Sequence, residues 1–348
     1  MSTQPLSPPH VRIGRYSLLL HPRAYLVSAM LAVTLAGLAL LSITAGSTTL
    51  TSSQVIDALW GQGPRRGVLH VWEVRLPRAI VGALTGAGLG LAGHLTQTMA
   101  RNRLATPDLL GVSQGATTAI LISLAGSATG FIGHWWVGPV GAICAVALVV
   151  LIAGGLEANG HRFLVVGLAV SMTASAVTDL ALARQGVHVS AALYTWTIGN
   201  LNGRGMEVAI PVALGLATLF PLAVALTRTL TVLRFDDDMA AGLGVNLARA
   251  RLTVLATAVG LAGLAVGVGG PIAFVALAAP VMAVRLNGPN GVPLPVTALV
   301  GACLVLAADT LGRVAFSHEL PVGVISGVLG GPFLLWVLLS DQSTRKTS

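Results

Sequence analysis

The chain has 348 residues, of which 54% are hydrophobic and only 9% are charged, and its mean hydropathy is +0.83. Soluble domains carry about 25% charged residues, so this composition excludes a protein that covers itself with a water-facing surface. The net charge of +8 does not indicate a nucleic-acid partner, because the basic residues are scattered between apolar segments without a basic stripe or interleaved aromatic residues.

Ten apolar segments are each long enough, or nearly so, to cross a bilayer, which takes about 20 residues in a helix. They predict an all-α, polytopic integral membrane protein whose residues 1–348 form a single transmembrane domain. The third and eighth segments are short or interrupted by Gly and Pro, which is tolerated only where neighbouring protein satisfies the backbone. The predicted spans are roughly 24–44, 79–100, 107–126, 137–157, 163–183, 208–227, 252–270, 271–286, 294–312 and 321–340.

The distribution of basic residues predicts the orientation of these spans. If residues 1–23 form a cytoplasmic tail, the C-terminal tail 341–348 is also cytoplasmic. This choice leaves thirteen of the twenty Lys and Arg residues inside, in agreement with the positive-inside rule. The first 23 residues lack the cleavage site of a signal peptide, so we expect the first span to be retained. Segment 47–60 is typical of a short amphipathic helix on the outer surface.

The second span contains a row of glycines followed by polar residues. Gly82, Gly86 and Gly90 recur every four residues, and His94 continues the row. Small residues at this spacing indicate a close helix–helix contact. Ionisable residues inside a membrane suggest function, so His94 and the nearby Gln97 are candidates for the transport pathway. The alternative is a packing role, in which a neutral His94 hydrogen-bonds to the backbone of a neighbouring helix.

The charged segment 228–251 is predicted to lie on the cytoplasmic side. It contains three consecutive aspartates, Asp236, Asp237 and Asp238, with arginines on both flanks. The aspartates favour a helix start, and Gly242 and Gly244 favour a tight turn. A membrane protein has little reason to fold such a segment in mid-chain unless a partner docks there. We therefore expect a docking site, the alternative being a solvated loop.

Several function classes lack their sequence signature. The single lysine, Lys346, follows no Gly-rich loop, so there is no Walker A motif and we expect no ATP hydrolysis by this chain alone. The sequence contains no HExxH or GxSxG motif, which disfavours a membrane enzyme. Cys144 and Cys303 show no metal-type spacing. We expect no catalytic residues, no metal ligands and no bound cofactor.

Two acidic residues lie inside predicted spans. Asp309 is expected to pair with Arg313, four residues later on the same helix face. Asp179 has no assigned role. One function class open to such a membrane protein is a secondary transporter driven by an ion gradient. A transporter of this kind would depend on these two carboxylates, because coupling ions need acidic residues near mid-membrane.

Three long motifs resemble a known family. RLPRAIVGALTGAGLGLAGHLTQTMARNRLATPDLLGVSQGA (75–116), GPIAFVALAAPVMAVRL (270–286) and LAADTLGRVAFSHELPVGVISGVLGGPFLLWVLL (306–339) closely resemble the permease subunits of ABC importers for iron–siderophores, haem and vitamin B12. The form FVALAAP, with Ala276 in place of a common Gly, looks most like the second permease of ferric catecholate siderophore systems. Arg103, Val281 and Val284 depart from the family pattern.

The resemblance implies a ten-helix permease in the bacterial plasma (inner) membrane that dimerises around a central pathway, with a heterodimer favoured over a homodimer. It implies two ATPase subunits on the cytoplasmic face and an extracytoplasmic substrate-binding protein outside. The cargo would be an iron(III)–siderophore, moved inward by alternating access, with haem or cobalamin as the alternatives.

The resemblance also implies roles for two groups of residues. Segment 228–251 looks like the coupling helices that enter a cleft of the ATPase. In similar permeases, arginines at the positions of Arg75, Arg78 and Arg313 receive acidic residues of the binding protein, for which bidentate Arg–carboxylate pairs are well suited. The alternative for these arginines is snorkelling at the membrane interface.

Overall fold

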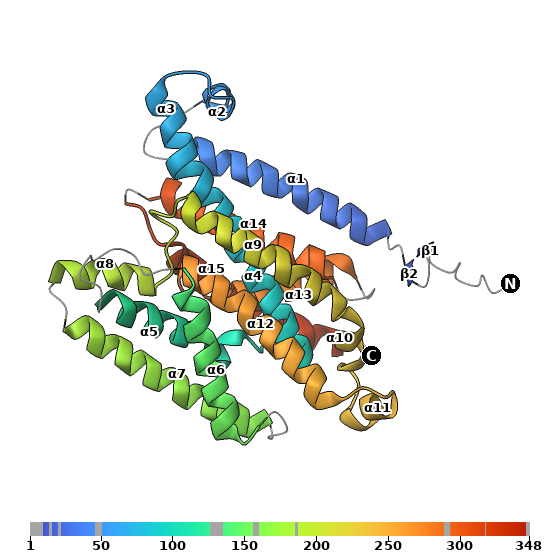
Figure 1. The fold of residues 1–348 in the computed structure, drawn as a ribbon. Coiled ribbons are helices and arrows are strands. Elements are labelled where there is room, and N and C mark those ends of the chain that lie inside the picture. Colours follow the sequence, from blue (N-terminus) through green and yellow to red (C-terminus); the bar gives the residue numbers. More distant parts are fainter. Residues whose placement is uncertain are drawn as a thin grey trace.

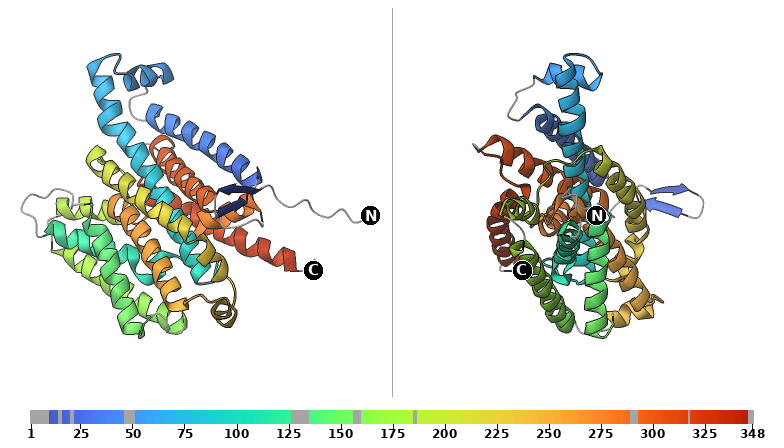
Figure 2. Two further views of the ribbon diagram at one scale, coloured as in Figure 1. Left: turned by 45° about the vertical axis from the view of Figure 1, so that its right-hand side comes forward. Right: turned by 60° about the vertical axis from the view of Figure 1, so that its left-hand side comes forward.

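The structure is a bundle of long, tilted helices (Figures 1 and 2). The computed structural model describes residues 10–13, 16–19, 22–45, 51–125, 135–155, 160–184, 187–288, 293–316 and 318–345. The predicted all-α architecture is confirmed, with one small addition inside the expected N-terminal tail. Strands β1 (His10–Ile13) and β2 (Tyr16–Leu19) pair antiparallel in a hairpin beside the bundle. Lys346 lies outside the described residues.

All ten predicted spans correspond to apolar helices among the described residues. By length and composition, six helices suffice to cross a membrane, and four apolar helices are shorter. A continuous helical run, Arg65–Met99, contains the second span and extends well beyond it at its outer end. The spans are α1 Pro22–Thr44, α4 Leu76–Met99, α5 Val112–Ala125, α6 Val137–Ala153, α7 Gly160–Ala183, α9 Met206–Ala225, α12 Leu247–Gly269, α13 Val275–Asn287, α14 Leu294–Val314 and α15 Val322–Arg345.

Short elements lie at the two ends of the bundle. Helices α2 (Ser52–Leu59) and α3 (Arg65–His70) and the π-helical turn η1 (Val71–Arg75) project at one end. Figures 1 and 2 place α11, the β-hairpin and the C-terminal end of α15 toward the other end, as expected if the N- and C-terminal segments and the charged segment share the cytoplasmic side. The remaining elements are α8 Val187–Thr197, the 3₁₀ helix η2 Pro107–Leu110, α10 Thr227–Val232 and α11 Asp237–Gly242.

The predicted amphipathic helix of segment 47–60 is α2, and residues 46–50 lie outside the described part of the chain. The helix begins after Thr51, which forms a capping box with Gln54. Capping of this kind satisfies two backbone donors that a helix start leaves without partners. Helix α8 is a finding that the sequence analysis did not predict.

The glycines of the second span, both in the predicted row and outside it, bring α4 into backbone contact with its neighbours. A Cβ atom added to Gly86 would collide with the backbone of Gly301 on α14, and one added to Gly93 would collide with the backbone of Ala276 on α13. A Cβ atom on Gly88 would lie 3.2 Å from the carbonyl oxygen of Leu261 on α12. Helix α4 is therefore the centre of the core, and the predicted helix–helix contact is present.

The eighth span starts later than predicted. Helix α13 begins at Val275, because Gly270 has a φ of +72° and Pro271 follows it. The non-helical backbone packs against the loop after α8, where Asn200 N–H donates to the carbonyl of Gly269 at 2.8 Å. A Cβ atom on Gly270 would lie 2.6 Å from the carbonyl oxygen of Trp196. Irregular backbone in a membrane protein requires this kind of burial.

Candidate coupling and docking sites

The acidic run of the charged segment lies at the start of α11. Asp236 is at the N-cap position, and Asp237 and Asp238 occupy the first turn. Negative charges at a helix N-terminus are favourable because they oppose the positive end of the helix dipole. Gly244 adopts a φ of +79°, whereas Gly242 is the last residue of the helix, so only Gly244 makes the predicted turn in left-handed backbone.

Asp237 connects this short helix to two core helices. Each of its carboxylate oxygens lies 2.8 Å from Nη2 of Arg251 on α12, and Oδ1 also accepts from Nη2 of Arg101 at 3.0 Å. Arg101 follows α4 with a φ of +50° and donates through Nη1 to the carbonyl of Phe235 at 2.7 Å. We call Arg101, Asp237 and Arg251 the cytoplasmic clasp. The hydrogen bond from Arg251 contributes most to lowering the pKa of Asp237, and the charges of Arg251 and Arg101 add to it.

The exposed surface of the charged segment beside the clasp carries both acidic and apolar side chains. The side chain of Asp236 is 98% exposed. Phe235, Met239 and Leu243 are exposed large apolar residues in the same segment. Exposed apolar residues beside charges are typical of a protein–protein contact. Asp237 therefore makes the closest attachment of the segment to the bundle, Asp236 adds a longer ion pair to Arg101 Nη1 at 3.6 Å, and the exposed side chains around them are open to a partner.

The three outer arginines predicted to dock a binding protein are not surface residues in this structure. Arg75 and Arg78 are 5% and 8% exposed. Arg78 Nη2 lies 2.9 Å from Asp309 Oδ1, and Arg313 Nε lies 3.2 Å from Asp309 Oδ2. The predicted pairing of Asp309 with Arg313 is confirmed, and Arg78 shares the same carboxylate.

Backbone carbonyls near the end of α1 bind the rest of this cluster. Arg75 Nη1 donates to the carbonyl of Ile43 at 2.6 Å, and Arg313 Nη2 donates to the carbonyl of Ser42 at 3.0 Å. Glu319, 3.3 Å from Arg78 Nη1, has a half-exposed side chain and connects the cluster to the outer surface. We call Arg75, Arg78, Asp309, Arg313 and Glu319 the outer arginine cluster. Its role in docking stays a prediction.

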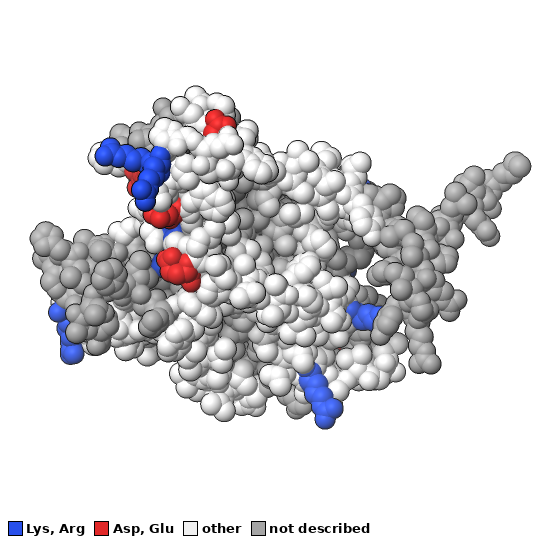
Figure 3. Space-filling model, turned by 45° about the horizontal axis from the view of Figure 1, so that its top comes forward, with Lys and Arg blue, Asp and Glu red and all other residues white. Residues whose placement is uncertain are grey.

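Exposed charges do gather at this end of the molecule. Figure 3 shows basic and acidic side chains close together on one end, while most of the remaining visible surface is uncharged or not described. Arg65 and Arg66 on α3 are exposed there. Both are among the seven basic residues that the predicted orientation leaves outside, and no role was predicted for either, although an Arg-Arg pair outside a membrane is itself an available signal.

His94 and Gln97 differ in their surroundings. His94 is 3% exposed, and its Nε2 has no hydrogen-bond partner within the described parts of the chain. Gln97 Nε2 donates to the carbonyl of Leu277 on α13 at 3.1 Å. The hydrogen bond to a neighbouring helix backbone, which the packing alternative assigned to His94, is made by Gln97. A pathway role for either residue stays a prediction.

The remaining acidic residue and the potential metal ligands do not form a binding site within the described part of the chain. Asp179 is exposed on α7. Among the described residues, no group of three or more His, Cys, Asp and Glu side chains is placed to bind a metal ion. From sequence, Arg101 counted only among the basic residues on the inner side and Arg251 only as a flank of the charged segment. Their pairing with Asp237, across 136 and 14 residues, was not predicted.

Comparisons with known proteins agree with this architecture. Residues 33–340 match the model of the FecCD transport family. The chain is 35% identical over 302 residues to the ferric enterobactin transport system permease protein FepG of Escherichia coli (strain K12), which covers 86% of this chain and 91% of that protein. It is 36% identical over 308 residues to the ferric enterobactin permease FepD of the same strain, covering 86% and 90% of the two chains.

A solved structure is similar as well. It is described as an inward-facing conformation of a metal-chelate type ABC transporter, and it aligns with a TM-score of 0.78 and 25% identity. The alignment covers 91% of this chain and 99% of that one.

Proposed function

This chain belongs to the FecCD transport family, and we propose that it moves a ferric siderophore into the cytoplasm as one of two different permease subunits of an ABC importer. The chain is a multi-pass permease of the inner membrane that works with a permease partner, and ATP is hydrolysed by a separate subunit of the system. Its motifs had indicated this family from sequence alone.

The cargo proposal rests on the two curated relatives described above, both of which are named for ferric enterobactin. A chelated iron needs no ligands from a permease, because the siderophore already surrounds the metal. We accordingly propose that this chain binds no cofactor and contributes shape and polarity to the pathway.

The heterodimer proposal has a separate basis. FepG and FepD are two distinct permeases of one named transport system in one strain, and this chain is about equally similar to both. We therefore propose a transport system with two different permease chains, of which this chain is one. This agrees with the resemblance of the FVALAAP motif to the second permease of ferric catecholate siderophore systems.

In the proposed mechanism, two ATPase subunits bind on the cytoplasmic side and push on segment 228–251. The cytoplasmic clasp attaches this segment to α4 and α12, so a displacement of α11 reaches the core directly. Helix α4 then passes the movement to α13 and α14 through its glycine contacts, because backbones in direct contact cannot slide independently. A substrate-binding protein docks at the opposite end, near the outer arginine cluster.

The test is uptake in a strain from which this gene is deleted. We expect loss of uptake of radiolabelled ferric enterobactin and its recovery when the chain is restored, with cobalamin and haem uptake unchanged. Affinity purification of the restored chain should also recover an ATPase and a second, different permease. Recovery of cobalamin uptake alone would contradict the cargo proposal, and recovery of only one permease sequence would contradict the heterodimer.

A further inference from the structure

The break between α12 and α13 ends at a strained residue. Phe274, the residue before α13, has a φ of +76° and a ψ of −33°, in backbone that side chains other than glycine rarely adopt. The amide of Val275 donates to the carbonyl of Ala273 at 2.9 Å, so the three residues form a γ-turn of the rare type with a positive φ. Such backbone persists only where the surrounding structure compensates for its cost in free energy. The residues that pack against Phe274 therefore hold this turn in place.

The ring of Phe274 packs against α15. Its centroid lies 5.1 Å from that of Phe333 in an edge-to-face arrangement, which is a favourable geometry for an aromatic pair. A Cβ atom added to Gly330 would lie 2.9 Å from Cγ and Cδ2 of Phe274, so the ring occupies space that a larger residue at position 330 would take. We call Phe274, Gly330 and Phe333 the aromatic latch.

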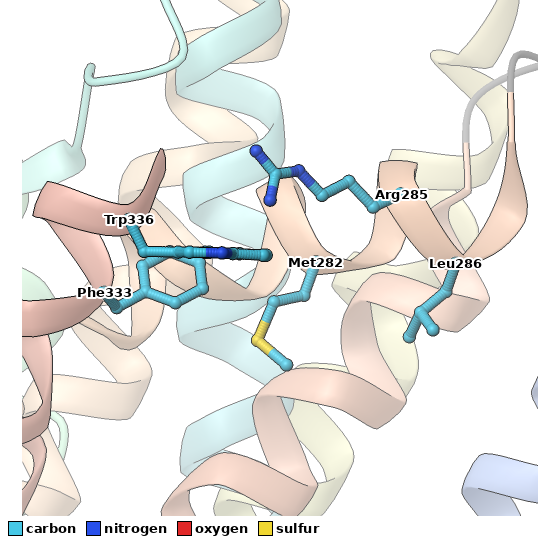
Figure 4. Close-up of a pocket in the computed structure, with 5 residues that line it drawn as sticks. All are labelled: Met282, Arg285, Leu286, Phe333 and Trp336. Carbon is cyan, nitrogen blue, oxygen red and sulfur yellow. The ribbon is translucent and has the colours of Figure 1, made fainter. Parts of the chain in front are cut away.

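Beyond the latch, α13 and α15 are separated by an apolar pocket. The two helices meet again near the end of α13, where the guanidinium carbon of Arg285 lies 4.1 Å from the ring centroid of Trp336. Side chains therefore leave space between the two helices, and close packing does not fix one against the other along this length. The pocket has a volume of about 450 Å³ and is lined by Met282, Arg285, Leu286, Phe333 and Trp336 (Figure 4).

Helix α4 contacts the first turn of α13. A Cβ atom added to Gly93 would collide with the carbonyl group of Ala276, so the backbones of α4 and α13 touch two residues after Phe274. Close-packed backbones transmit a displacement because there is no free volume between them to absorb it. A movement of α4 therefore acts on the first turn of α13, next to the strained residue.

We propose that the aromatic latch is a two-state element of the transport cycle. In the present conformation, the ring of Phe274 packs against Gly330 and Phe333 and holds the γ-turn against its strain. When α4 displaces α13, the ring leaves α15 and the turn relaxes to a negative φ. Strain favours release and packing opposes it, so the two states are close in free energy, as a switch requires. The proposal rests on the alternating access of the proposed function, but not on its cargo or on the second permease.

A permanent bend is the alternative, and the residue type argues against it. A glycine at position 274 would make the same turn without strain, because glycine adopts positive φ freely. The break already uses a glycine in this way at Gly270, whose φ is +72°. Phenylalanine at position 274 instead combines a strained backbone with a ring that packs on another helix. Strained residues held by their surroundings are typical of switch regions.

The experiment measures the distance between α13 and α15 in the purified importer complex in lipid discs. Spin labels are attached at Val284 on α13 and Val328 on α15, both exposed, in a chain whose Cys144 and Cys303 are replaced by alanine. Double electron–electron resonance is recorded without nucleotide and after trapping with ATP and vanadate, with no chelate present. We expect two distance populations, latched and released, whose ratio changes on trapping. A single distance in both conditions would mean a permanent bend and would overturn the proposal.

Glycine variants of α15 test the packing. Gly330→Ala places a methyl group against the ring of Phe274, so overpacking should shift the ratio toward the released population by about tenfold. Gly331→Ala is the matched control on the same helix, since nothing lies within 4 Å of its added Cβ atom. Equal ratios in the two variants would overturn the latch, while a ratio that still changes on trapping would leave alternating access intact.

Two variants of Phe274 test the strain. Phe274→Ala and Phe274→Gly both remove the ring, but only glycine adopts a φ of +76° without strain. The latched population relative to the released one should therefore be about tenfold larger in Phe274→Gly than in Phe274→Ala. Neither variant adds volume, so this comparison gives the test on its own where Gly330→Ala does not assemble. Equal populations in the two variants would show that the turn is not strained and would overturn the proposal.

Discussion

The carboxylate of Asp237 lies 2.8 Å from Nη2 of Arg251, and this ion pair joins the short helix α11 to the long helix α12. Asp237 also binds Arg101 after α4, so one side chain connects the segment expected to meet the ATPase with two helices of the core. The neighbouring Asp236 is almost fully exposed, and its Oδ1 lies farther from Arg101, 3.6 Å from Nη1. Three consecutive aspartates that look equivalent in the sequence therefore have different roles in the structure.

Asp237→Asn should raise the number of ATP molecules hydrolysed per chelate transported. The variant weakens a partly exposed ion pair, and such pairs contribute about 0–1 kcal/mol each, so the membrane fold should be unaffected. The matched control is Asp238→Asn, which removes a charge from the same helix turn without touching the clasp. Transport and ATP hydrolysis are measured together in proteoliposomes. An unchanged ratio for Asp237→Asn would mean that the clasp does not transmit coupling.

The clasp should be insensitive to pH across the physiological range. The pKa of Asp237 is held below its ordinary value, chiefly by the hydrogen bond from Arg251. A depressed pKa contributes stability above the unfolded value of about 3.9, and this stability is lost as the pH falls through the folded value. The protection factors for amide exchange in α11, which correct for the pH dependence of the intrinsic exchange rate, should therefore be constant from about pH 5.5 to 8 and fall only in stronger acid. A transition near neutral pH would exclude Asp237 as the residue that attaches α11.

Asp309→Asn should be among the most destabilising conservative changes in the chain. Asp309 is 1% exposed and is shared by Arg78 and Arg313, so its neutralisation removes the buried counter-ion of both cations and leaves only the half-exposed Glu319 beside Arg78. Breaking a buried pair in this way costs about 3–5 kcal/mol. Glu319→Gln is the control, because the half-exposed Glu319 contacts only the edge of the cluster. Equal thermal stability of the two variants in detergent would show that the cluster is solvated.

Gly93→Ala should reduce the yield of folded protein. The added methyl group would collide with the backbone of Ala276, and a backbone contact cannot be relieved by a change of rotamer. Overpacking of a core typically costs about 1–3 kcal/mol. Gly37→Ala on α1 is the matched control, since nothing lies within 4 Å of its added Cβ. The two variants are compared by size-exclusion chromatography. A monodisperse Gly93→Ala protein at wild-type yield would contradict the close contact between α4 and α13.

The docking role of the outer arginines can be separated from their structural role. Arg→Glu at position 75, 78 or 313 should abolish stimulation of ATP hydrolysis by the binding protein, and added salt should reduce the difference because the Debye length is about 8 Å at 0.15 M. Because all three side chains have internal partners, each variant needs a measurement of thermal stability beside it. Arg65→Glu and Arg66→Glu change exposed charges at the same end. If only these two variants lose stimulation while remaining stable, the predicted arginines are structural.

Prediction from the sequence was most successful for the spans. The segment predicted at 294–312 is the helix Leu294–Val314, and the segment predicted at 208–227 is the helix Met206–Ala225. Helix α8 and the β-hairpin were missed, because both are short and neither has the apolar length that identifies a span. The four-residue glycine period was visible, but the sequence did not identify the backbone against which each glycine packs.

The candidate sites were predictable as segments and not as contacts. The sequence indicated that Asp236 to Asp238 form a cytoplasmic cluster, and it placed Arg75, Arg78 and Arg313 at the outer end. It did not reveal that Asp237 is bound by Arg101, 136 residues away, or that Asp309 is bound by Arg78, 231 residues away. No local pattern encodes such pairs.

The sequence by itself determined the membrane class and the spans and predicted their orientation, because a bilayer requires long apolar helices and biases basic residues toward the cytoplasm. The three motifs also determined the family. Only the tertiary structure decided which arginines are buried with Asp309 and which aspartate makes the closest ion pairs between α11 and the bundle. Those features depend on helices that are distant in sequence and adjacent in space. Whether a charged side chain has a structural role or is available to a partner protein depends on the residues that pack against it.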